Sequence, residues 1–273
     1  MVSLPDLFWA VVLCSLFLAL WDCGRSPLGT TEALRRFTPA GVVLLLLVVG
    51  FVAVNLARFG WAEAAYLFGA ASQFGVIILG SIIFFCGGWP IVERAGCVGL
   101  FGRVRRRIDG TQGPSAARAA AETLLVAAGV ILLSWRVFVI ARSLGVNVQP
   151  SQAFERWFLK PDSMDKRSGY AMLLILLAPV WEETTFRWYI LNRLEEALRG
   201  WRWKRLVAVV ASSALWACGH AALTEPFWVK MVQIFIVGCL LSWRFRVIGL
   251  SGCIIAHMAM NVTVLFTLLW FRL

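Results

Sequence analysis

The stretch AMLLILLAPVWEETTFRWYIL, residues 171–191, is apolar enough to cross a membrane, yet it carries Glu182, Glu183 and Arg187. A membrane-spanning helix needs about 20 mainly apolar residues. An ionisable side chain at the centre of such a helix costs at least roughly 2.5–3.5 kcal/mol. Three charged groups in one span therefore indicate a functional site, with a structural ion pair as the alternative.

The chain contains only two histidines, and each of them lies in another long apolar stretch. His220 belongs to LVAVVASSALWACGHAAL, residues 206–223, and His257 to IGLSGCIIAHMAMNVTVLFTLLW, residues 248–270. Asn261 follows His257 by four residues, so the two share one face of a helix. Two carboxylates, an arginine, two histidines and an asparagine on three spans predict a buried reaction centre.

The composition predicts an all-α membrane protein. The 273 residues are 60% hydrophobic, with a mean hydropathy of +0.78, which no water-soluble domain of this size reaches. Open sheets cannot span lipid, so the spans are helical. We expect about eight of them, with the active site in the C-terminal four-helix core, at residues 5–21, 39–57, 64–88, 119–141, 170–191, 206–223, 229–243 and 248–270.

The net charge of +11 does not indicate a nucleic-acid partner, because the basic residues follow the loops between spans. Sixteen of the 26 Lys and Arg lie in the loops after spans one, three, five and seven, and eight lie on the opposite side. The positive-inside rule makes the richer side cytoplasmic and places both termini outside. The basic run GRVRRR, residues 102–107, is expected to contact anionic headgroups of the lipid bilayer.

The chemistry-bearing residues divide the chain into two unequal parts. Residues 1–168 are predicted to form N-terminal transmembrane helices and loops that carry no recognisable motif. Residues 169–273 hold nearly all of the intramembrane polar groups and are predicted to form the catalytic transmembrane core.

Helix geometry decides which polar groups can meet. Glu183 and Arg187 are four residues apart and can pair, whereas the adjacent Glu182 points about 100° away from Glu183. A carboxylate in a low-dielectric site is suited to taking a proton from water, and a nearby histidine can relay that proton. His257 and Asn261 can donate two hydrogen bonds to a developing oxyanion. Together these groups make a peptidase without a serine or cysteine nucleophile.

Three motifs on successive spans carry a family resemblance: EETTFR (182–187), WACGH (216–220) and HMAMN (257–261). Their order and spacing resemble the CPBP family of intramembrane glutamic endopeptidases, which includes the CAAX proteases and bacterial bacteriocin-processing proteins. The resemblance covers about the last 105 residues. It departs from the family at Trp216, where the second motif usually begins with Phe.

The resemblance implies a role for each matched residue. Glu182 would be the general base for water, and His220 would assist it. His257 and Asn261 would stabilise the oxyanion, and Glu183 and Arg187 would support the site. The substrate would be a membrane-associated protein or peptide. The membrane is a bacterial inner (plasma) membrane or an endoplasmic reticulum membrane, and the excess of arginine over lysine, 22 to 4, favours the bacterial one.

Other functions are compatible with parts of this pattern. A zinc protease could use the two histidines and a glutamate, although H-E-x-x-H is absent and no cofactor is expected. A non-catalytic scaffold or immunity protein of the same family is a second alternative, although such relatives are expected to have lost a Glu or a His. A proton-coupled transporter is a third, but the polar groups are confined to one half of the chain.

Overall fold

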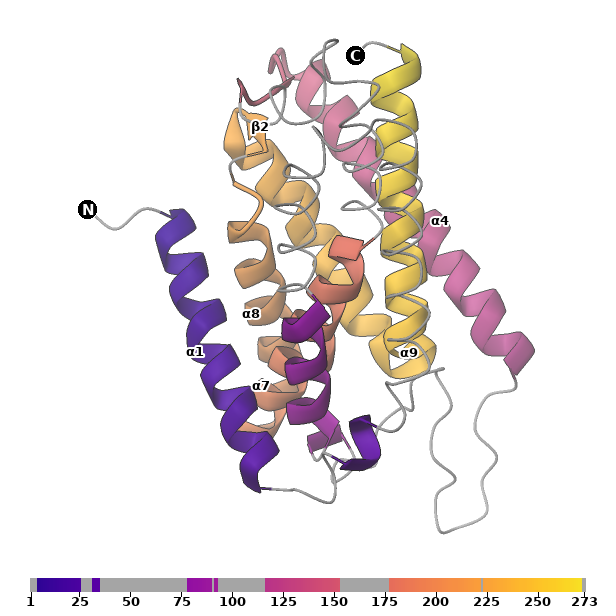
Figure 1. Ribbon diagram of the computed structural model, residues 1–273. Coiled ribbons are helices and arrows are strands. Elements are labelled where there is room, and N and C mark those ends of the chain that lie inside the picture. Colours follow the sequence, from indigo (N-terminus) through magenta and orange to yellow (C-terminus); the bar gives the residue numbers. More distant parts are fainter. Residues whose placement is uncertain are drawn as a thin grey trace, which may run out of the picture.

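The computed structural model describes residues 4–25, 31–34, 78–89, 91–92, 116–152, 177–221 and 223–271. These residues are mostly helical, as the composition predicted. The longer elements are α1 (Leu4–Arg25), α4 (Ala116–Ser143), α8 (Lys204–Cys218) and α9 (Phe227–Phe271), which run roughly up and down the bundle in Figure 1. A shorter apolar helix spans Ile78–Trp89.

The structure describes the helix that carries the EETTFR motif from residue 177 onward, and this helix continues without a break through two further elements. These are the π-helix η4 (Thr184–Ile190) and α7 (Leu191–Ala197). A turn at residues 198–203 then leads into α8, so the segment 193–205 is only partly helical. The helix and α8 thus form an antiparallel pair.

α9 consists of two helical arms that meet at Gly249 (Figure 1). Gly249 has φ +68°, a left-handed conformation that glycine adopts without steric cost. The two arms correspond to the predicted spans 229–243 and 248–270. The prediction of a loop between these two spans is wrong, because Arg244 and Arg246 are helical. Arg244 pairs with Glu122, and Arg246 pairs with Glu195.

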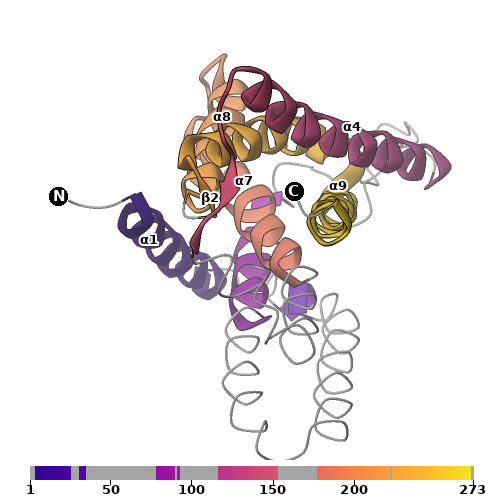
Figure 2. The same cartoon turned by 90° about the horizontal axis from the view of Figure 1, so that it is seen from above.

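Small residues and side-chain hydrogen bonds hold the arms of α9 against their neighbours. The first arm packs on α4, where Gln233 donates a hydrogen bond to Ser134 (Figure 2). It also packs on α8, where a Cβ on Gly238 would lie only 2.9 Å from the Cβ of Ser213. Small residues let membrane helices approach closely. Gly238 therefore brings Trp216 of α8 against α9, within 3.1 Å of that hypothetical Cβ.

Within the part of the chain that the structure describes, two helices are long and apolar enough to cross a membrane, Ala120–Ser143 and Phe227–Val264. The predicted span 39–57 lies outside the described residues. The predicted span 206–223 is shorter than expected, because α8 ends at Cys218. The number of eight spans stays a prediction.

A small antiparallel sheet was not predicted from the sequence. β1 (Gln149–Pro150) pairs with β2 (Thr224–Glu225), with Gln149 opposite Glu225. β1 lies just after α4, and β2 lies between α8 and α9. The sheet therefore joins two loops at the same end of the bundle (Figure 1).

Candidate active site

The two glutamates stand where the helix widens from α to π geometry. Glu182 and Glu183 are the last α-helical residues before η4. The hydroxyl of Thr184 donates to the carbonyl of Trp181, at 2.9 Å, and that of Thr185 donates to the same carbonyl at 2.8 Å. These bonds satisfy backbone acceptors at the change of geometry. Single π turns are frequent at functional sites.

Glu183 is the fully buried carboxylate of the pair. Its side chain is 0% exposed, as is that of Arg187, whose Nε lies 3.3 Å from the Glu183 carboxylate. Nδ1 of His257 lies 2.9 Å from the other oxygen of Glu183. The Arg187 guanidinium also stacks over the ring of Trp216, with Cζ 3.9 Å from its centroid. The Glu183 carboxylate is therefore paired with the Arg187 guanidinium and the His257 imidazole, and it holds both side chains in place.

Glu182 faces the histidines instead, and its side chain is 14% exposed. One of its carboxylate oxygens accepts a hydrogen bond from the indole nitrogen of Trp216 at 2.5 Å. The same oxygen lies 3.6 Å from Nε2 of His220 and 3.9 Å from Nε2 of His257. Of the two adjacent carboxylates, Glu182 is the one that retains access to water.

His220 lies in the turn that follows α8, one residue after the helix cap at Gly219. Its Nδ1 is 3.0 Å from the backbone carbonyl of Trp216. Because a carbonyl only accepts, Nδ1 must be the donor in this bond. In the neutral imidazole, Nε2 then carries a lone pair toward Glu182. Two acceptors face each other across 3.6 Å, so a donor placed beside them can bond to both.

Trp216 lies between the charged groups and both imidazoles. It is completely buried, and its ring meets those of His220 and His257 edge to face, at centroid distances of 5.3 and 5.1 Å. The sequence identified Trp216 only as a departure from the family's usual Phe. The structure makes Trp216 a hydrogen-bond donor to Glu182, which a phenylalanine at the same position would not be.

The structure thus brings together five of the six predicted site residues: Glu182, Glu183, Arg187, His220 and His257. The sixth, Asn261, is partly buried one helical turn beyond His257 on the second arm of α9.

Lys230 is a charged neighbour that the sequence interpretation assigned to an outer loop. It lies in the first turns of α9 and is close enough to Glu182 and His220 to act on both electrostatically. Lys230 also begins the stripe that continues through the buried residues Ile234 and Val237. A lysine inside the apolar stretch 227–243 was the signal that could have identified it.

Each of the two carboxylates has a basic side chain near it. Arg187 lies against Glu183, and Lys230 is close enough to Glu182 to act on it electrostatically. Buried charges persist only where they are paired. Among the described residues, no group of three His, Cys, Asp or Glu side chains is arranged to hold a metal ion.

Comparison with known proteins gives two matches. Residues 167–263 match the family described as type II CAAX prenyl endopeptidase, Rce1-like. The sporulation-killing factor biosynthesis protein SkfC of Bacillus subtilis (strain 168) is 32% identical over 66 residues, which are 24% of this chain and 13% of that protein.

The chain therefore spans only a small part of that relative. No solved structure matches the chain. The matched family segment begins before Glu182 and ends after Asn261, so it includes all three motifs and every group of the cluster. Residues 167–263 accordingly form a domain of the Rce1-like type II CAAX prenyl endopeptidase family.

Proposed function

We propose that this protein is an intramembrane endopeptidase that hydrolyses a peptide bond in a membrane-associated protein or peptide. The observation that carries the proposal is that His220 and His257 both lie near one oxygen of Glu182, a carboxylate whose side chain is partly exposed. It is supported by membership of residues 167–263 in an endopeptidase family. About eight spans in a bacterial inner membrane are part of the same proposal.

Water is activated between Glu182 and His220. A water molecule there donates one hydrogen bond to the Glu182 carboxylate and the other to the Nε2 lone pair of His220. Glu182 accepts the proton as the water oxygen attacks the substrate carbonyl carbon. The proton then passes to the leaving amine as the carbon–nitrogen bond breaks. No covalent intermediate forms with the enzyme.

His257 and Asn261 stabilise the oxyanion. Nδ1 of His257 lies 2.9 Å from Glu183, so the Glu183 carboxylate holds the imidazole in place. The Nε2–H group of His257 and the Asn261 amide are the two donors for the oxyanion. Arg187 lies against Glu183 and thereby supports the contact that positions His257.

The test is a comparison of membranes that contain wild type, Glu182→Ala or Glu196→Ala at matched protein levels. Glu196 is a control carboxylate on α7, outside the cluster. New protein termini should be present with wild type and Glu196→Ala and absent with Glu182→Ala. Identical termini in all three would rule out the proposed peptidase and favour a non-catalytic scaffold. Loss of the termini on addition of a metal chelator would instead establish a zinc enzyme.

A further inference from the structure

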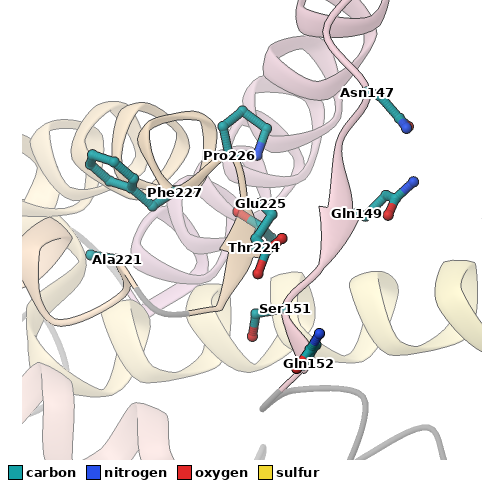
Figure 3. A pocket seen from close by; sticks show the side chains of 9 residues that line it. All are labelled: Asn147, Gln149, Ser151, Gln152, Ala221, Thr224, Glu225, Pro226 and Phe227. Atoms are coloured by element: carbon teal, nitrogen blue, oxygen red, sulfur yellow. The ribbon is translucent and has the colours of Figure 1, made fainter.

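A pocket of about 720 Å³ opens at the small sheet (Figure 3). Its walls come from the loop after α4 with β1 and from β2 with the start of α9. Its size lies within the range of specific ligand sites, roughly 300–1,000 Å³. The side chains that matter most for recognition are Gln149, Ser151, Gln152, Thr224, Glu225 and Phe227.

The wall of the pocket is connected to the turn that holds His220. Ala221 lines the pocket and directly follows His220 in the chain. The amide of Leu223 donates to the carbonyl of His220 at 3.2 Å, and the amide of Ser151 donates to the carbonyl of Leu223 at 3.2 Å. A ligand in this pocket therefore lies next to the turn that contains His220 and contacts the same backbone hydrogen-bond network.

The lining favours an extended polypeptide with a basic side chain. Amide, hydroxyl and strand backbone groups provide both donors and acceptors, and Phe227 adds an apolar surface. Glu225 is exposed and lines the pocket, and the nine lining residues include no Lys, Arg or His. The hydroxyl of Thr224 is buried without a hydrogen-bond partner among the described residues. A basic side chain would complement the Glu225 carboxylate.

We propose that this pocket, hereafter the β1–β2 pocket, binds an extended, basic segment of the substrate outside the membrane and thereby presents the adjoining peptide bond to Glu182. The proposal rests on the proposed peptidase function for the identity of its ligand. It adds a substrate-recognition site, with Glu225 as its specificity-determining residue, at a distance from the reacting atoms. The segment binds in extended form because strands β1 and β2 offer extended backbone.

The test measures binding without turnover. Two fluorescein-labelled nonapeptides differ only in carrying two lysines or two glutamates at the same positions. Each is titrated against the full chain carrying Glu182→Gln in phosphatidylcholine nanodiscs, and Kd is read from fluorescence anisotropy. The same titrations are made with Glu225→Lys and with the charge-matched control Glu196→Lys added to that chain.

Glu225→Lys is expected to weaken binding of the lysine peptide relative to the glutamate peptide by about three- to tenfold, the scale of an exposed charge pair changed from attraction to repulsion. Glu196→Lys should leave the ratio unchanged. An equal effect of both variants, or no binding of either peptide, would overturn the β1–β2 pocket as a peptide site. Hydrolysis is separate: a peptide that binds but is never cut by the unmodified chain contradicts only the proposed function.

Discussion

Replacement of Trp216 by phenylalanine tests whether the indole hydrogen bond to Glu182 matters to catalysis. The change deletes the donor at 2.5 Å and keeps an aromatic ring between the two imidazoles. A hydrogen bond to a charged group contributes roughly 1.5–3 kcal/mol. Each 1.4 kcal/mol or so is tenfold in rate. We therefore expect Trp216→Phe to lower kcat/KM by about ten- to a hundredfold, because Glu182 is no longer held toward His220.

The assay uses the membrane substrate that the Glu182→Ala comparison identifies, and it follows formation of the new terminus after pulse labelling. Trp135→Phe is the matched control, because Trp135 lies on α4 and is 54% exposed. Thermal unfolding in detergent separates a catalytic loss from a folding defect. If Trp216→Phe folds and its rate stays within about twofold of wild type, the bond contributes under roughly 0.5 kcal/mol and the reasoning is refuted.

Further predictions concern packing, charge and metal. Gly88→Ala should lower the free energy of unfolding by about 1–3 kcal/mol, because its Cβ would lie 2.6 Å from the Trp188 ring; thermal unfolding should show no such change for Gly24→Ala, where nothing lies within 4 Å. Lys230→Met should reduce the cleavage rate severalfold, because it removes the cation that acts electrostatically on the catalytic carboxylate, and equal loss with Lys204→Met on the exposed start of α8 would contradict this. Cleavage should survive a metal chelator in the same assay.

Local patterns in the sequence were enough to predict helices and the members of the cluster. The relation of Glu183 to Arg187, four residues on, depends only on helix periodicity, and the pair lies 3.3 Å apart as that spacing predicts. The order of the three motifs predicted the endopeptidase family, which the match over residues 167–263 confirms. Apolar length similarly predicted α4 and both arms of α9.

Long-range contacts were decided only by the tertiary structure. Trp216 donates to Glu182 across 34 positions, and Lys230, at the start of α9, is close enough to act electrostatically on the same carboxylate. The helices packed around the two adjacent glutamates decide that Glu183 is fully buried and that Glu182 is partly exposed. Helix periodicity relates residues within about one turn of each other, whereas these contacts depend on how separate helices cross.

The small sheet and the bend in α9 are two further features that depend on long-range packing and not on local sequence patterns. β1 and β2 are two residues each and lie about 75 positions apart, so neither has enough alternation to predict a strand or its partner. Glycine 249 was visible in the sequence, but glycine tolerates helical and left-handed backbone alike, and only the packing of the two arms selects φ +68°. The sequence by itself determined the helical, membrane-type chain and its chemical groups. The tertiary structure determined which groups meet, because that depends on long-range packing.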